Sequence, residues 1–188
     1  MAPAAAPRGP NVRVRPLGAE RYRFYLEGSL TPGWAGNLAS GLATSQFSIE
    51  RGEARAERGG IWAARFEVRR LAGAVPFESI DVAALAATDA GEGFATPLRL
   101  IGFTLEASVE RGGCLVVGVS AHDSVGFLAA LLRRLAFFSL FPIELRLETR
   151  TGRVDDQLWL RGAGDRTPSL RAQEALRRAL AVHEAEHT

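Results

Sequence analysis

Residues 115–135 read LVVGVSAHDSVGFLAALLRRL, and this stretch decides the fold. Residues 115–119 are continuously apolar, which indicates a strand covered on both faces. The turn that follows ends at Gly126, and residues 127–140 predict a helix that is apolar on nearly all sides. One side of this helix packs on a sheet. The surplus favours a contact with another chain, with the rest of this chain as the alternative partner.

The same strand, turn and helix occur earlier in the chain. At an offset of 93 residues (126 minus 33), Gly33 corresponds to Gly126 and Trp34 to Phe127. The alternating residues 22–26 then correspond to the strand at 115–119. Self-similarity at a fixed spacing is the signature of a duplicated structural unit. The sequence therefore predicts two copies of one small fold.

A hairpin and a second helix complete each copy. The hairpin strands are expected at residues 47–57 and 61–69 in the first copy, and at 143–149 and 154–161 in the second. Gly59-Gly60 and Thr151-Gly152 form the turns, where glycine supplies the positive φ that such turns need. The second helix is expected to begin at Pro76 in the first copy and at Pro168 in the second, with Thr167 as its N-cap.

One further strand is expected at residues 101–109, where apolar and polar side chains alternate. It follows the second helix of the first copy and is assigned to that copy. After its own second helix, the second copy has only a polar tail. The second copy is therefore expected to lack a full fourth strand.

This order of elements resembles the ACT domain. Residues 120–129, SAHDSVGFLA, are similar to the strand–turn–helix motif of that family. Residues 149–160, TRTGRVDDQLWL, are similar to a hairpin in the C-terminal ACT repeats of the uridylyltransferase that senses nitrogen status. The resemblance covers about residues 21–180. The first copy departs from the motif because Leu30 stands where the family has an aspartate.

The resemblance implies an α+β fold with two ferredoxin-like (βαββαβ) repeats, each an antiparallel sheet with helices on one face. The expected organisation is a disordered leader at residues 1–18, a first repeat at 19–110, and a second repeat at 111–188 that ends in a polar tail. The resemblance further implies a non-catalytic regulatory protein. The alternative is a structural or dimerisation module whose ligand site has decayed.

ACT units bind amino-acid effectors near the loop between the first strand and the first helix, at a repeat or subunit interface. Carried onto this chain, the site comprises His122, Asp123, Ser124, Val125, Gly126 and Phe127, with a weaker site at Leu30, Thr31, Pro32 and Gly33. A helix N-terminus suits a ligand carboxylate, and Asp123 suits its ammonium group. Asp123 and Ser124 are also plausible helix caps. Glutamine is the leading candidate ligand because of the resemblance to the nitrogen sensor.

Composition narrows the class of protein. The formal net charge is only +2, which is far from the basic excess of a dedicated nucleic-acid binder. RNA-recognition modules share this order of elements, but here Glu67, Asp155 and Asp156 lie on the expected third strands and would repel phosphates. No apolar stretch reaches the ~20 residues that span a bilayer. Neither nucleic acid nor membrane is an expected partner.

The remaining motifs give no catalytic, metal or cofactor site. Cys114 lies in an apolar run and is expected to be a buried, inert thiol. Asp155 and Asp156 lack companions at metal-ligand spacing and are interpreted as a polar hairpin edge. The expected protein is cytoplasmic, forms homo-oligomers, and acts on its own assembly or on a protein partner.

Overall fold

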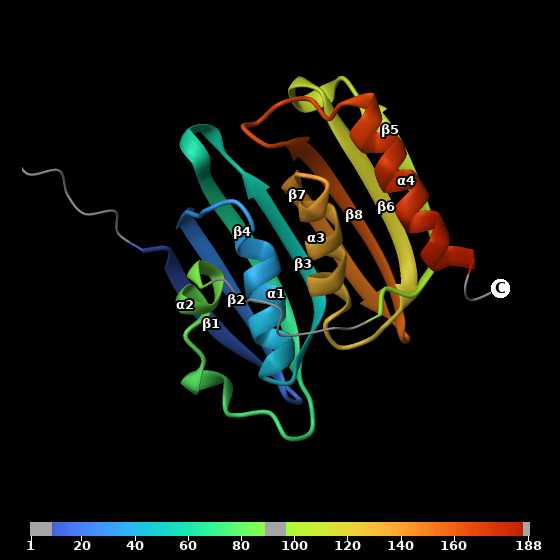
Figure 1. Cartoon of the computed structure of the whole chain (residues 1–188). Helices are drawn as coiled ribbons and strands as arrows, with labels where there is room; N and C mark the ends of the chain where they lie inside the picture. Colours follow the sequence, from blue (N-terminus) through green and yellow to red (C-terminus); the bar gives the residue numbers. More distant parts are fainter. Residues whose placement is uncertain (1–8, 89–96, 186–188) are drawn as a thin grey trace, which may run out of the picture.

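A computed structural model describes residues 9–88 and 97–185 of the chain. Within these residues the chain forms one eight-stranded sheet, with four helices on one of its faces (Figure 1). The strands are β1 (Asn11–Gly18), β2 (Arg21–Ser29), β3 (Phe47–Ala56), β4 (Ile61–Arg70), β5 (Leu100–Ser108), β6 (Cys114–His122), β7 (Leu140–Arg150) and β8 (Arg153–Gly162). The helices are α1 (Trp34–Thr44), α2 (Val82–Ala87), α3 (Phe127–Phe137) and α4 (Leu170–Ala185).

All strand pairs are antiparallel, and the strand order is β1-β2-β4-β3-β7-β8-β6-β5. The fold is therefore α+β, with two ferredoxin-like repeats that share a continuous sheet. The two halves meet where β3 pairs with β7, from Arg51 opposite Glu148 to Arg55 opposite Glu144. The core is also continuous, because buried residues of both halves form a single apolar cluster.

The duplication expected from the sequence is confirmed in the backbone. Helices α1 and α3 begin and end 93 residues apart (127 minus 34, and 137 minus 44). Both helices follow a glycine in the left-handed region, with φ of 92° at Gly33 and 84° at Gly126. Strand β3 has a bulge between Ile49 and Arg51, and β7 has one between Pro142 and Glu144, again 93 residues apart. The two halves therefore share local irregularities as well as regular elements.

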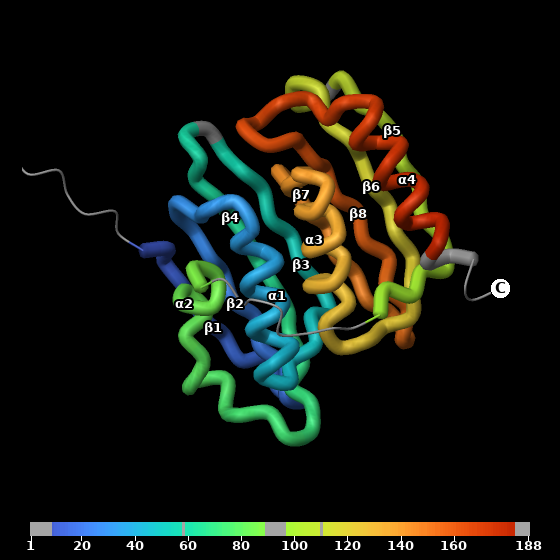
Figure 2. Tube along the Cα trace, in the orientation of Figure 1, coloured from blue at the N-terminus to red at the C-terminus, as the bar shows by residue number. Residues whose placement is uncertain are grey.

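The sequence analysis expected a disordered leader at residues 1–18, and for part of this segment that expectation is wrong. Residues 11–18 form β1, which pairs with β2 from Asn11 opposite Glu27 to Gly18 opposite Arg21. This strand lies at an edge of the sheet (Figure 2) and most of its side chains are exposed. An exposed edge strand is held by backbone hydrogen bonds, so its apolar alternation is weak and the sequence analysis missed it. Residues 1–8 lie outside the described residues.

The strand expected at 101–109 exists, but it does not join the first half of the sheet. It is β5, which pairs with β6 from Leu100 opposite Ala121 to Ser108 opposite Cys114. Strands joined by a short connection usually pair with each other, and the assignment to the first copy overlooked this preference. No strand follows α4 among the described residues, as predicted, but β5 occupies the place of the fourth strand. Each half thus begins with its edge strand.

The second helices begin later than expected. In the first half, a single turn at Phe77–Ser79 precedes α2, and the Asp81 side chain caps α2 by accepting a hydrogen bond from Ala84 N at 2.9 Å. In the second half, Ser169 Oγ accepts a hydrogen bond from Ala172 N at 3.2 Å, so Ser169 and not Thr167 is the side-chain cap of α4.

The apolar surplus of α3 is buried against the first half of the chain. Helices α1 and α3 lie side by side on the sheet, and Gly36 of α1 lies against the Leu132 side chain (Figure 1). Leu128 and Leu132 are accordingly buried, whereas Phe137 at the end of α3 is exposed. A contact with another chain stays a prediction.

Cys114 is buried, as expected. None of the helices in the described ranges is both long and apolar enough to cross a bilayer.

Candidate functional site

Two cavities lie at opposite ends of the contact between α1 and α3. One, here called the acidic cavity, is lined by the end of α1, the start of β3, the loop between β6 and α3, and parts of β7 and β8. The other, the apolar cavity, is lined by the loop between β2 and α1, the end of α3, the start of β7, and the loop after β8. The duplication relates these two places, because each combines the strand–helix loop of one half with the hairpin of the other.

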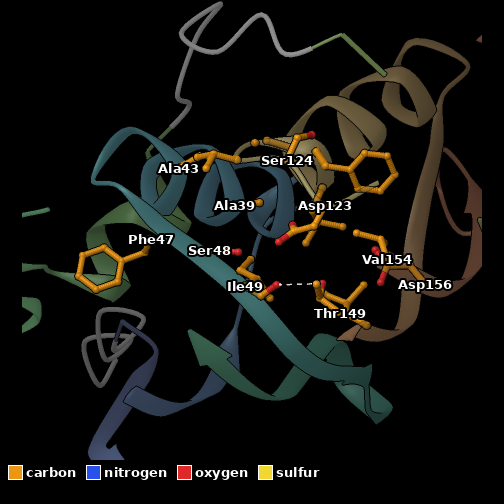
Figure 3. Close-up of a pocket in the computed structure, with 16 residues that line it drawn as sticks. Ala39, Ala43, Phe47, Ser48, Ile49, Asp123, Ser124, Thr149, Val154 and Asp156 are labelled. Atoms are coloured by element: carbon orange, nitrogen blue, oxygen red, sulfur yellow. Dashed lines mark hydrogen bonds between the residues drawn. The ribbon is translucent and has the colours of Figure 1, made fainter. Parts of the chain in front are cut away.

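The acidic cavity opens where the seam between the halves ends. Strands β3 and β7 pair as far as Arg51 and Glu148, and beyond that point the Thr149 hydroxyl donates a long hydrogen bond to Ile49 O at 3.4 Å. The loop between β6 and α3 covers the gap. Asp123 N donates to Gly152 O at 2.8 Å, which ties this loop to the β7–β8 turn. In Figure 3 the Asp123 side chain extends from the second half toward Ser48 and Ile49 of the first.

The N-terminus of α3 faces this cavity without a side-chain cap. The N-cap residue is Gly126, which has no side chain with which to cap the helix. The expectation that Asp123 or Ser124 caps the helix stays a prediction. The amides of Leu128 and Ala129 belong to the first turn, where no intrahelical acceptor exists, and both residues line the cavity. Such amides are a suitable site for a carboxylate.

Two carboxyl groups converge on the same cavity. Asp156 on β8 is 5% exposed, and burial raises its pKa to about 7, although Asp156 Oδ1 accepts a hydrogen bond from Glu148 N at 3.1 Å. Partial burial also raises the pKa of Asp123, against the opposing effect of Arg69. Each of these raised pKa values means that nearby positive charges and hydrogen bonds do not fully offset the cost of burying the ionised carboxyl. A bound cation would supply it.

The acidic cavity is small as it stands. Its volume is about 40 Å³, which holds a few water molecules. Ser48 and Thr149 add hydroxyl groups to the lining, and apart from Asp123 and Asp156 the described lining carries no charge. The cavity thus has both helix amides and carboxyls in its lining, as a zwitterion requires, but an amino acid needs more room.

The structure places most of the predicted second-repeat residues together. Residues 123–127 all line the acidic cavity, whereas His122 is exposed at the end of β6 and lies outside the lining. The sequence analysis missed the contributions of the other elements, above all Asp156. Asp156 was interpreted as part of a polar hairpin edge, but it faces inward between Val154 and Leu158. The sequence did contain a signal, because Asp156 takes the place of an apolar residue in the alternation of inward-facing side chains that includes Val154 and Leu158.

The apolar cavity is much larger, at about 720 Å³. Of the predicted first-repeat residues, Leu30, Pro32 and Gly33 line it, while Thr31 contributes its carbonyl oxygen as an acceptor for Trp34 N at 3.1 Å. The walls are mainly apolar and include Trp34, Trp62, Leu132, Phe141 and Pro142. The rings of Trp34 and Trp62 pack edge to face with centroids 5.1 Å apart.

A third hollow lies on the helix-free face of the sheet and is lined by arginine and acidic side chains. Many of these charges pair with one another across strands. Arg23 bonds Glu67 at 2.6 Å, and Arg65 bonds Glu53 at 3.2 Å. Because its charges largely compensate one another, this face offers less to a ligand than either cavity beneath the helices.

Comparisons with known proteins bear on the fold. No protein-family model matches the sequence, and no curated protein sequence is similar to it. Among solved structures, the crystal structure of aspartate kinase from Synechocystis matches 89% of this chain with a TM-score of 0.51 and 15% sequence identity. What the two chains share is the fold.

That likeness agrees with the two ferredoxin-like repeats described above. The chain spans only 28% of the length of the aspartate kinase chain, so the enzyme named in that title is a much larger protein.

Proposed function

We propose that this protein is a non-catalytic regulatory module that binds an amino-acid effector at the interface between its two repeats. The carrying observation is the acidic cavity, where the uncapped N-terminus of α3 and the carboxyls of Asp123 and Asp156 converge beside β3 of the other repeat. A free amino acid is a zwitterion. Its carboxylate suits the helix amides, and its ammonium suits the two acids.

Binding in this cavity would be coupled to the arrangement of the repeats. Since about 40 Å³ cannot hold an amino acid, the loop between β6 and α3 must move away from β3 for the effector to enter. The effector therefore favours an arrangement in which the loop between β6 and α3 lies farther from β3. It shifts the population only by its difference in affinity for the two arrangements.

The finer parts of the proposal follow from the ACT resemblance. Glutamine is the leading effector, the module forms homo-oligomers or contacts a protein partner, and it works in the cytoplasm. We also place the division between the repeats in the connection between α2 and β5, in place of the expected boundary at residues 110 and 111, because β5 pairs with β6.

The direct test is thermal unfolding of the full chain against each of the twenty amino acids at millimolar concentration. A ligand at ~100 times its dissociation constant adds about 2.7 kcal/mol and raises the melting temperature by several degrees. We expect one amino acid, or a small group, to raise it. Asp123→Asn should weaken that response without changing the size of the oligomer.

A second candidate function is a structural or dimerisation module with a decayed ligand site. The small volume of the acidic cavity favours it, because in this arrangement the cavity admits no amino acid. A flat response to all twenty amino acids, together with a stable oligomer, would support this alternative against the sensor.

A further inference from the structure

The two outer strands of the sheet differ in how their free edges are covered. Helix α4 packs along β5, and Arg177 of this helix donates a hydrogen bond to Leu105 O of β5 at 3.3 Å. Strand β1 has eight residues, mostly with exposed side chains, and the helix that packs near it is the short α2 (Figure 1). A long and open edge strand is a template for a further strand.

The register shows which backbone groups β1 leaves unpaired. Arg70 N of β4 donates to Glu20 O at 2.8 Å, so alternate residues of β4 point their N–H and C=O groups toward β2. Carried through the pairing of β2 with β4 and with β1, this alternation places the N–H and C=O groups of Val12 and Val14 on the outer side of β1. Pro16 is in the same alternation and has no N–H, as is usual where a proline nitrogen faces solvent.

The side chains of β1 differ between the two faces of the sheet. Val14 is 49% exposed and lies on the helix-covered face with Val12, because it pairs with the buried Phe24. Arg13 and Arg15 lie on the helix-free face, and both are exposed. The free edge therefore has an apolar row on one face and a basic row on the other.

The basic row carries charge that the described residues do not compensate. The neighbouring arginines of β2 and β4 each pair with a glutamate; they are Arg21, Arg23, Arg65 and Arg69. Arg13 instead lies over the Tyr25 ring, with its guanidinium carbon 5.6 Å from the ring centroid. In the described part of the chain, neither Arg13 nor Arg15 has a carboxylate partner.

These charges select the kind of strand that fits the edge. If β1 paired with β1 of a second copy about a two-fold axis at Val14, Arg13 would lie opposite Arg15 of the second copy. Like charges that face each other directly across strands are destabilising, whereas opposite charges stabilise the pair. The edge therefore fits a strand with acidic residues at every second position better than it fits a second copy.

We propose that the free edge of β1 binds an extended segment of a partner protein in which acidic and apolar residues alternate. The acids face Arg13 and Arg15, the apolar side chains lie beside Val12 and Val14, and the backbone pairs with the outward N–H and C=O groups. Residues of β1 line neither the acidic nor the apolar cavity. The inference thus goes beyond the proposed function and gives the module a separate surface for a protein partner.

The first test compares the charge of short peptides. A fluorescently labelled peptide in which glutamate and valine alternate is titrated with the full chain by anisotropy, beside a peptide with lysine in place of each glutamate. We expect the glutamate peptide to bind at least about tenfold tighter at low salt, because only its charges complement the two arginines. If the lysine peptide binds as tightly, or if neither peptide binds, the inference is wrong.

The second test distinguishes strand pairing from attraction between charges alone. In an added strand, every second N–H group faces β1 and the others face solvent. Two forms of the glutamate peptide are compared, one N-methylated at all valines and the other at all glutamates. We expect one form to lose binding and the other to keep it. Equal affinities of the two forms would contradict backbone pairing and overturn the inference.

A pair of double variants locates the binding. Arg13→Glu with Arg15→Glu should reverse the preference, so that the lysine peptide binds tighter. The matched control is Arg171→Glu with Arg178→Glu, which changes the net charge equally at exposed positions of α4 and should keep the preference for the glutamate peptide. If both double variants reverse the preference, or if the β1 variant changes the size of the oligomer, the assigned edge or its occupant is wrong.

The same measurements separate this inference from the proposed function. The substituted arginines line neither cavity, so both double variants should keep any amino-acid response of the wild-type chain. A chain that responds to an amino acid but binds neither peptide overturns only the present inference. A chain that binds the glutamate peptide at β1 but responds to none of the amino acids overturns only the proposed function.

Discussion

The acidic and the apolar cavities are built on one backbone plan and differ almost entirely in side-chain chemistry. Each lies between the strand–helix loop of one half and the hairpin of the other, and each faces a helix that starts from a left-handed glycine. One has two carboxyls and about 40 Å³ of space, and the other has none of the equivalent acids and about 720 Å³. The duplication thus fixes where each cavity lies, whereas the side chains decide its size and its charge.

The largest effect is expected from Asp156, the residue that distinguishes the acidic cavity most. Its pKa of about 7 in the folded chain lies above its usual value of 3.8. The stability that it contributes is therefore complete below about pH 4 and is lost as the pH rises through about 7. Asp156→Asn should stabilise the chain at pH 8 by up to about 4 kcal/mol and change little at pH 4. Urea unfolding at both pH values measures this.

The control for that experiment is Asp155→Asn, the exposed neighbour on the same strand. Asp155 contributes to the raised pKa of Asp156, so this control should have a small effect in the same direction. If Asp156→Asn stabilises the chain equally at pH 4 and pH 8, the pKa of Asp156 is not raised to about 7 and this prediction is wrong.

Amino-acid binding should depend on pH in the acidic cavity. A bound ammonium group favours the ionised form of Asp156, so binding releases a proton when Asp156 is protonated. With a pKa of about 7 in the free chain, the affinity should rise about tenfold between pH 6 and pH 8. Calorimetric titrations in buffers of different ionisation enthalpy measure both the affinity and the proton release. Affinity that falls with pH would contradict this model.

The shared backbone of the two sites can be tested with a matched pair of glycine substitutions. Gly33 and Gly126 have φ values of 92° and 84°, where a Cβ is unfavourable. Gly33→Ala and Gly126→Ala should therefore each destabilise the chain by about 1–2 kcal/mol. Chemical denaturation of both variants makes the comparison, and Gly9→Ala is a control without this constraint. A large difference between the two would mean that the loops are not equivalent.

The smallest effect is expected at the seam between the cavities. Arg51 and Glu148 face each other across β3 and β7 at 3.6 Å; the Arg51 side chain is exposed and the Glu148 side chain is partly exposed. Arg51→Ala should cost less than about 0.5 kcal/mol, since exposed ion pairs contribute little. Unfolding at low and high salt checks this. If Arg51→Ala lowers the free energy of unfolding by more than about 1 kcal/mol, the ion pair contributes more than exposed ion pairs usually do.

Much of the fold was accessible from the sequence because the duplication doubled every signal. The glycine before each first helix, the apolar periodicity of that helix and the hairpin turns all recur. Helix α1 begins at Trp34, as the correspondence of Trp34 with Phe127 predicts. The edge strands were harder. Strand β1 has mostly exposed side chains, and β5 has a clear alternation that does not say which neighbour it pairs with.

The candidate site was accessible only in part, for a related reason. The loop at residues 122–126 is local in sequence and carries a motif, so it could be found. Asp156 and Ser48 lie on other strands, and only the tertiary structure brings them to that loop. The volume of the apolar cavity had no sequence signal at all, because it depends on the distance between packed elements.

The early position of the edge strands affects how the chain can be made. Since β1 precedes β2, all four strands of the first half of the sheet are translated before any residue of β5. The nascent first half needs no later segment to complete its hydrogen bonding, apart from the exposed edge of β3. The edge of β3 pairs with β7, so the seam and both cavities can form only after β7 has been translated.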